Sequence, residues 1–212
     1  MRPRIGVLSL QGDFERHSRS IEALALEAVR VSLPEHLEGL AALVLPGGES
    51  STMLRLLEST ELRAPLERFV REKPVLATCA GVILLARRAD RLPRPTLGVL
   101  DVVVERNAYG RQVHSFTASV DVRSLAGPFT GVFIRAPRIT RVGEGLEIVA
   151  TRALEDGSSE VVGVRSGCLV GLCFHPELTS DLRMHRWFLG AVAGLRLPAV
   201  SAPETSRSPE AA

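Results

Sequence analysis

The sequence is poor in aromatic residues, which make up 4% of its 212 residues and include one Trp and one Tyr. It also lacks a marked excess of charge of either sign, since 26 Lys and Arg stand against 24 Asp and Glu. The basic residues are scattered and form no stripe. Because a nucleic-acid-binding surface needs clustered basic residues, we expect no nucleic-acid partner.

Long hydrophobic runs are also absent. No stretch approaches the roughly 20 apolar residues that a membrane helix needs, and the first residues, MRPRIGVLSLQGDF, lack the apolar core and cleavage site of a signal peptide. Cysteine is scarce, with only Cys79, Cys168 and Cys173 and no C-x-x-C pair, which argues against a disulfide framework. These absences predict a cytoplasmic protein without a membrane partner.

Hydrophobic residues are plentiful, at 45%, in a chain long enough for one domain with a sizeable core. In the first 90 residues, short β-rich runs alternate with helical ones, an order typical of a parallel sheet covered on both faces. Ligands bind such sheets at the carboxyl ends of the strands. The expected strands are 4–10, 29–33, 41–46 and 74–78, and the expected helices are 13–28 with Asp13 as N-cap, 51–60, 61–73 and a run from Val82 to Ala86.

From about residue 96 the pattern changes to strands separated by turns, which predicts antiparallel additions to the sheet. We therefore expect an α/β fold of the single-domain, three-layer type, with a mainly parallel central sheet and antiparallel additions. The predicted domain spans residues 1–196, and the tail 197–212, which has no periodicity, is predicted to be disordered. The later strands are expected at 97–107, 112–122, 131–137, 146–154, 159–167 and 168–177, followed by a helix at 181–195.

Cys79 stands at the joint between the strand 74–78 and the helical run that follows it. Buried cysteines often act as small apolar groups, so packing is the simplest explanation for an isolated one. Here the small residues Ala80 and Gly81 allow a tight strand-to-helix turn, which would raise the Cys79 side chain above the sheet beside free helix N–H groups. Those groups favour a thiolate, so a nucleophile explains the position equally well.

Gly47 and Gly48 follow the strand 41–46 and precede Glu49 and three hydroxyl residues. A phosphate-binding loop is one interpretation, but no Lys follows the glycines and Glu49 would repel a phosphate. A loop whose N–H groups face a neutral or developing anionic oxygen fits better. An ordinary capped turn stays an alternative. Its N-cap candidates are Ser50, Ser51 and Thr52.

The segment HPELT, at 175–179, follows the apolar run CLVGLCF, at 168–174. In an extended chain, His175 and Glu177 lie on the same side, where they can contact each other or a third group. An imidazole held by a carboxylate is a common proton acceptor for a nucleophile, although an isolated His is more often packed or solvated. Strand alternation places Cys173 behind the same site and Cys168 in the core, which separates the ligands that a zinc site would need.

Five segments carry a family resemblance: LPGGESST (45–52), TCAG (78–81), VVVERNAYGRQVHSF (102–116), FTGVFIRAP (129–137) and FHPELT (174–179). Together they closely resemble the glutaminase subunit of pyridoxal 5′-phosphate synthase, a triad-type, class I glutamine amidotransferase. TCAG and HPE alone would indicate only the wider amidotransferase class, whereas the other segments narrow it to this family. The resemblance runs from about residue 4 to residue 195.

The resemblance implies that the chain hydrolyses L-glutamine to glutamate and ammonia. The ammonia would pass to a barrel-shaped synthase subunit, in a large hetero-oligomer that makes pyridoxal 5′-phosphate, the vitamin B6 cofactor. The resemblance implies neither a metal nor a bound cofactor for the glutaminase itself.

The resemblance also implies roles for individual residues. Cys79 matches the nucleophile, His175 the general base and acid, and Glu177 the residue that orients the His. Gly48 and the N–H of Ala80 match the oxyanion hole. The positions that hold glutamine are matched by Gly48, Glu49, Ser50, Arg106, Ile134 and Arg135, and a position near the active site and the partner interface is matched by Gln11.

Ala77 is a departure from the family pattern, because relatives usually have Gly before the Thr of the turn. One methyl group at a strand end is tolerated where φ is negative. We therefore expect little effect on the chemistry.

Two alternatives keep the same cysteine. The chain could be the amidase of a different amidotransferase, or a cysteine hydrolase acting on another amide. It could also be a redox or stress sensor in which Cys79 is oxidised, but a sensor has no need of a His-x-Glu pair. The sensor leaves both GGESST and HPELT unexplained.

Overall fold

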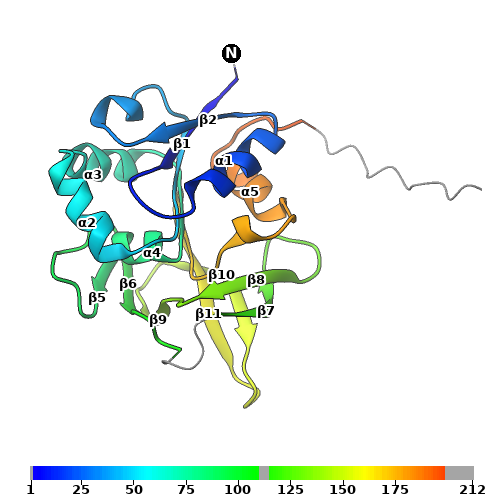
Figure 1. Ribbon diagram of the computed structural model, residues 1–212. Helices are drawn as coiled ribbons and strands as arrows, with labels where there is room; N and C mark the ends of the chain where they lie inside the picture. The colour runs from blue at the N-terminus through cyan, green and yellow to red at the C-terminus, as the bar shows by residue number, and fades with distance from the viewer. Residues whose placement is uncertain (1, 110–114, 199–212) are drawn as a thin grey trace, which may run out of the picture.

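A nine-stranded sheet forms the centre of the computed structural model, which describes residues 2–109 and 115–198 (Figure 1). Half of the sheet is parallel and consists, in spatial order, of β2 (Glu27–Val31), β1 (Arg4–Leu8), β3 (Ala42–Leu45), β4 (Val75–Thr78) and β12 (Leu169–Leu172). Antiparallel strands continue it, in the order β11 (Ser159–Ser166), β10 (Glu147–Ala153), β7 (Ser115–Val122) and β8 (Phe129–Ile134).

The three central strands β3, β4 and β12 are buried along their whole length. Their sequences, ALVL, VLAT and LVGL, are continuous apolar runs, as expected for parallel strands covered on both faces. Because they lie side by side and run in parallel, their carboxyl ends meet at one edge of the sheet. Residues 46–50, 79–80 and 173–177 leave the sheet at this edge.

Helices cover both faces of the parallel half (Figure 1). On one side lie α1 (Phe14–Ala23) and α5 (Arg183–Trp187), and on the other lie α2 (Ser50–Ser59), α3 (Arg63–Glu72) and α4 (Ala80–Leu85). Shorter helical segments are the 3-10 turns η1 (Pro34–Leu37) and η2 (Pro176–Leu178) and the π-helical η3 (Phe188–Val192). The predicted α/β fold, with a mainly parallel central sheet and antiparallel additions, is confirmed.

Not every later strand extends the central sheet, and on this point the prediction was wrong. A separate three-stranded sheet is formed by β5 (Ala86–Ala89), β6 (Leu100–Glu105) and β9 (Arg138–Val142). The chain becomes extended directly after α4, where the carbonyls of Leu84 and Leu85 accept hydrogen bonds from Leu97 and Val99. Hydrophobic alternation alone does not reveal which sheet a strand will join.

Two predicted helices are shorter or less regular than expected. The helix predicted at 13–28 ends at Ala23, because Ala25 has a positive φ of 60° that a helix cannot continue through. The helix predicted at 181–195 begins at Arg183 and changes to π-helical geometry after Trp187. Boundaries of this kind depend on tertiary contacts more than on local pattern.

None of the described helices combines the length and the apolar content that crossing a membrane requires. Residues 110–114, which include the first three residues of the predicted strand 112–122, lie outside the described part of the chain, as do residues 199–212, most of the predicted tail. The domain limits 1–196 and the disorder of the tail therefore stay predictions.

Candidate active site

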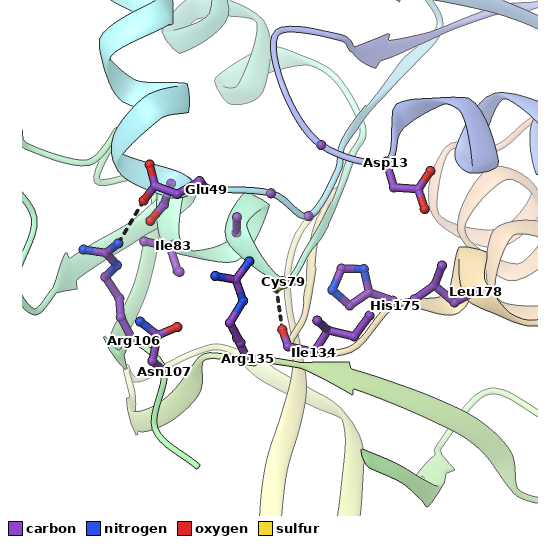
Figure 2. A pocket seen from close by; sticks show the side chains of 15 residues that line it. Asp13, Glu49, Cys79, Ile83, Arg106, Asn107, Ile134, Arg135, His175 and Leu178 are labelled. Atoms are coloured by element: carbon purple, nitrogen blue, oxygen red, sulfur yellow. Dashed lines mark hydrogen bonds and ion pairs between the residues drawn. The ribbon is translucent and has the colours of Figure 1, made fainter. Parts of the chain in front are cut away.

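A pocket of about 300 Å³ opens at the sheet edge where β3, β4 and β12 end (Figure 2). Its volume is in the range of small-molecule binding sites. The predicted residues that line it are Gly48, Glu49, Ser50, Cys79, Ala80, Arg106, Ile134, Arg135 and His175. Glu177 and Gln11 contact these residues from outside the lining. The structure thus brings together residues that are more than a hundred positions apart in the sequence.

Cys79 occupies a strained turn between β4 and α4, with φ 48° and ψ −107°. A non-glycine residue in such a conformation costs about 1–3 kcal/mol and is common at functional sites. The backbone N–H of Cys79 donates to the carbonyl of Leu172, at 2.8 Å, which fixes the turn to β12. The thiol points into the pocket and lies 3.9 Å from the carbonyl oxygen of Ile134 (Figure 2). The tight strand-to-helix turn expected from the sequence is therefore present.

His175 and Glu177 form a short contact, with 2.6 Å between His175 Nδ1 and Glu177 Oε1. The contact was expected, but the reason given for it was wrong. Residues 176–178 form the 3-10 turn η2, so the chain is not extended there, and this turn brings the carboxylate back to the imidazole. Gly47 is also required, because a Cβ on it would overlap the His175 ring.

The charge state of this pair follows from its surroundings. Burial acts to lower the pKa of His175, but the nearby Cys79 side chain, together with the hydrogen bond to Glu177 and its negative charge, outweighs burial and raises that pKa to about 10. Burial acts to raise the pKa of Glu177, but His17 and His175 outweigh it and hold this pKa well below its usual range. The site therefore favours an imidazolium between an ionised carboxylate and the thiol.

Glu49, rather than one of the hydroxyl residues, is the N-cap of α2. Its carboxylate accepts from the N–H groups of Ser51 at 3.0 Å and Thr52 at 2.6 Å. The N-cap role expected for Ser50, Ser51 or Thr52 is therefore wrong, because the longer side chain of Glu49 already satisfies these donors. Although burial opposes it, hydrogen bonding from Thr52 and Ser51 lowers the pKa of Glu49.

Arg106 lines the pocket, and its guanidinium is held by protein groups. It pairs with Glu49 Oε1 at 3.2 Å, donates to Ser51 Oγ at 3.2 Å and donates to the carbonyl of Arg91 at 2.6 Å. Arg135, in contrast, has a positive φ of 43° and presents its side chain to the pocket (Figure 2). Arg106 thus holds the Glu49 side chain in place at the pocket, and Arg135 is better placed to bind an anionic group.

Replacing Glu49 by Ala is expected to lower the free energy of unfolding by about 1 kcal/mol near pH 7, as is typical for loss of an N-cap. The pKa of Glu49 is lowered in the folded state, so its contribution is complete above the ordinary value and is lost as the pH falls through the folded value. The difference from the wild type should therefore shrink in acid. Urea unfolding at pH 7 and pH 4 measures it.

Asp13→Ala is the matched control for this prediction. Asp13 also occupies an N-cap position, at α1, and was expected to cap that helix. However, its side chain accepts no helix N–H and pairs with Arg16 at 3.0 Å on the surface. Its replacement should cost only a few tenths of a kcal/mol. Equal losses for the two variants would contradict the capping role of Glu49.

Gln11 reaches the glycine loop, where its Oε1 accepts from the N–H of Glu49 at 2.5 Å. Gly48 makes room for it, because a Cβ on Gly48 would overlap the Gln11 side chain. The two glycines therefore serve the close approach of side chains. Ala77 lies within β4 and is not among the described residues with positive φ, so the condition for its tolerance is met.

The other two cysteines, Cys173 and Cys168, differ in burial. Cys173 is fully buried, and burial, followed by the nearby Cys79 and Glu160, raises its pKa. It backs the site as expected. Cys168 is only half-buried in the turn between β11 and β12, so the expectation that it packs in the core is wrong. No group of three or more potential metal ligands occurs among residues 2–109 and 115–198.

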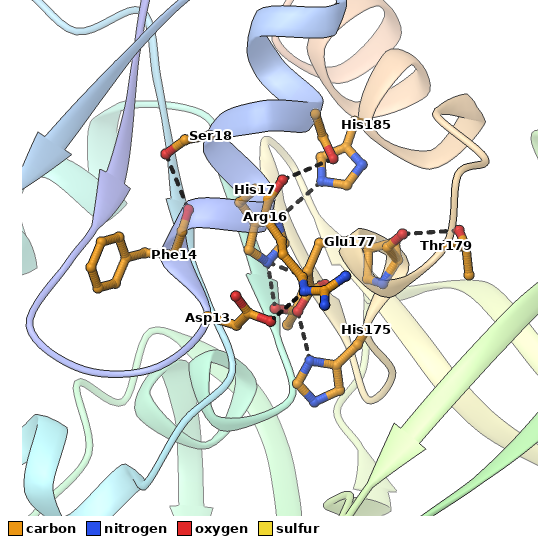
Figure 3. A network of polar contacts seen from close by, with 12 residues as sticks. Asp13, Phe14, Arg16, His17, Ser18, His175, Glu177, Thr179 and His185 are labelled. Atoms are coloured by element: carbon orange, nitrogen blue, oxygen red, sulfur yellow. Dashed lines mark hydrogen bonds and ion pairs between the residues drawn. The ribbon is translucent and has the colours of Figure 1, made fainter.

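Sequence reasoning missed the side chains behind Glu177. His17 and His185 are both buried, and His17 lies within 3.2 Å of Glu177 Oε2 (Figure 3). His17 stands on the inner face of an amphipathic helix, where a polar residue among apolar positions was the one available signal. Nothing in the sequence connects it to residues 160 positions away.

A cysteine at a strained strand-to-helix turn, beside a His–Glu pair at the carboxyl edge of an α/β sheet, is typical of enzymes that act through a cysteine nucleophile. The sequence profile of the SNO glutamine amidotransferase family matches residues 7–193. The chain therefore belongs to the SNO glutamine amidotransferase family.

Individual relatives agree with this assignment. Pyridoxal 5′-phosphate synthase subunit PdxT of Geobacillus kaustophilus is 48% identical over 190 residues, 89% of this chain and 94% of that protein. The protein of the same name from Thermotoga maritima is 48% identical over 191 residues, 89% of this chain and 99% of its own length. A solved structure described as glutamine amidotransferase has a TM-score of 0.82 and 46% identity, and the match covers 90% of this chain and 99% of that one.

Proposed function

We propose that this chain is the glutaminase subunit of pyridoxal 5′-phosphate synthase. It hydrolyses L-glutamine to L-glutamate and ammonia and delivers the ammonia to a synthase subunit. The observation that carries the proposal is that Cys79 and His175 line one pocket, with Glu177 2.6 Å from His175, in a chain of the glutamine amidotransferase family. The names of the relatives, which are synthase subunits, support the particular product.

In the proposed reaction Cys79 and His175 act on the substrate, and Glu177 supports His175 throughout. The Cys79 thiolate attacks the side-chain amide carbon of glutamine, and a tetrahedral intermediate forms. The His175 imidazolium donates its Nε2 proton to the leaving nitrogen, so that ammonia departs and a thioester remains. Water then attacks the thioester while His175 accepts its proton, and glutamate leaves. Glu177, 2.6 Å from His175 Nδ1, holds the ring and its charge through both steps.

Backbone N–H groups stabilise the developing oxyanion in this proposal. Ala80 is the first residue of α4, so its N–H has no carbonyl partner within the helix. Gly48, which also lines the pocket, supplies the second donor. Each such donor is typically worth about 3 kcal/mol in the transition state. Glu49, Ser50, Ile134 and Arg135 line the remaining pocket and hold the glutamine, while Arg106 keeps Glu49 in place.

The proposed partner is the barrel-shaped synthase subunit, in a large hetero-oligomer, with Gln11 near the interface. We also propose a cytoplasmic location. The three cysteines are free thiols, as a reducing compartment would keep them. Residues 1–196 form the proposed glutaminase domain.

Glutamine carrying ¹⁵N in its side-chain amide tests the proposed function. With the synthase subunit and its other substrates present, we expect glutamate release and ¹⁵N in the pyridoxal 5′-phosphate formed. The synthase alone with labelled glutamine is the control. Absence of glutamate release, or equal hydrolysis of unrelated esters and peptides, would refute the proposal. Full function of a His175→Asn variant would instead favour the redox sensor.

A further inference from the structure

A buried polar cluster lies behind the proposed catalytic pair, on the side away from the pocket (Figure 3). It joins α1 to α5, β4 and η2. Each member is at most 4% exposed. The members are His17, His185, Thr78 and Glu177. The mechanism described above uses only Glu177 of these four.

Short distances link the cluster from end to end. One carboxylate oxygen of Glu177, Oε1, contacts His175 Nδ1, and the other, Oε2, lies 3.2 Å from His17 Nε2. This second contact has ion-pair distance without aligned hydrogen-bond geometry, and the described residues offer Oε2 no better partner. His17 Nε2 also lies 3.2 Å from Thr78 Oγ1, and His17 Nδ1 lies 3.0 Å from His185 Nε2. His17 therefore touches both the carboxylate and the residue that precedes Cys79.

The positions of the protons follow from these contacts. Burial lowers the pKa of His185 to about 3, so His185 is neutral and carries one N–H. Its Nδ1 has no partner, so the N–H belongs on Nε2, where it can donate to His17 Nδ1. His17 then carries its own proton on Nε2, facing Thr78 and Glu177. The opposite arrangement would turn a lone pair to the carboxylate and leave an N–H of His185 buried without an acceptor.

We propose that His17, supported by His185, is a positioning residue for the glutaminase reaction: its Nε2–H holds the free oxygen of Glu177 and thereby keeps His175 aligned and protonated beside Cys79. This inference rests on the proposed function. Three groups from other elements face His17, namely Glu177 of η2, His185 of α5 and Thr78 of β4. Of the charged residues near His17 in sequence, Arg16 pairs with Asp13, the N-cap of α1, and Glu15 pairs with Arg30, both at the surface.

Two variants of similar polarity separate positioning from packing. In His17→Gln the amide nitrogen reaches about as far as Nε2 and can still donate to Glu177, whereas in His17→Asn it reaches only about as far as Nδ1. In the complex with the synthase subunit, we expect His17→Asn to lower kcat for glutamine hydrolysis about tenfold or more. In a plot of kcat against pH, the alkaline limb of this variant should lie about one pH unit lower than that of the wild type, because His175 loses its proton more easily.

His17→Gln is expected to stay within about threefold of wild-type kcat, with its alkaline limb unmoved. If the two variants had the same kcat and the same alkaline limb, the proposal would be overturned. A residue that only packs would make the variants differ in stability and in nothing else. Thermal unfolding of both variants is measured alongside.

A measurement on the unaltered chain does not depend on the folding of variants or on activity. Long-range ¹H–¹⁵N NMR of the chain labelled with ¹⁵N-histidine distinguishes the two imidazole tautomers. We expect His17 to be protonated at Nε2 and bare at Nδ1 near pH 7. The reverse tautomer would overturn the proposal even if glutamine is hydrolysed. Failure of glutamine hydrolysis by the wild-type complex would instead refute the proposed function, and the tautomer would still be measured.

Discussion

Cys79→Ala is expected to reduce glutamine hydrolysis at least about 10⁴-fold while leaving the fold and the binding of the synthase subunit intact. The thiol is the single nucleophilic side chain in the proposed mechanism, and without it the thioester cannot form. Alanine keeps the Cβ and accepts the same backbone conformation as Cys, with φ 48°, so the strain of the turn is unchanged. Glutamate release by the complex, measured beside thermal unfolding of the chain, tests this expectation.

Cys168→Ala is the matched control, because it removes a thiol from the half-buried turn between β11 and β12, away from the pocket. This variant should keep its activity within about twofold of the wild type. Glutamate release by Cys79→Ala at more than a hundredth of the wild-type rate would contradict the assignment of the nucleophile. So would equal losses in the two cysteine variants.

The parallel half of the fold could be predicted because its pattern is local. Strands such as 74–78 are continuous apolar runs, and the helices between them have apolar faces at helical spacing. The separate sheet of β5, β6 and β9 could not be predicted, because pairing between strands depends on contacts between distant residues. The early end of α1 could not be predicted either, because Ala25 has a φ of 60° although alanine favours helices.

The candidate site was more predictable than the fold around it. Carboxyl ends of neighbouring parallel strands meet at one edge, so the positions after residues 45, 78 and 172 had to lie together. Local detail was less accessible: the Glu177 contact arises from a 3-10 turn, and Glu49 caps α2 in place of its hydroxyl neighbours. His17 was missed because its partners come from three other elements.

Glu177→Gln is expected to lower kcat for glutamine hydrolysis by roughly 10³–10⁴-fold. The substitution preserves size but removes the negative charge 2.6 Å from His175 Nδ1. With that charge absent, burial is opposed mainly by Cys79, so the pKa of His175 should fall from about 10 toward or below its ordinary value. The imidazolium that protonates the leaving ammonia is then lost at lower pH.

The sign of the pH effect distinguishes this cause from a general loss of structure. A group whose pKa is raised in the folded enzyme keeps its proton up to that pKa, so the wild-type alkaline limb lies high and that of Glu177→Gln should lie lower. KM should change little, because Glu177 does not line the pocket. Glu155→Gln, a change at an exposed turn, is the control and should alter neither kcat nor the position of the alkaline limb. If Glu177→Gln kept its alkaline limb unmoved and more than a tenth of wild-type kcat, Cys79 alone would be sufficient to keep His175 protonated.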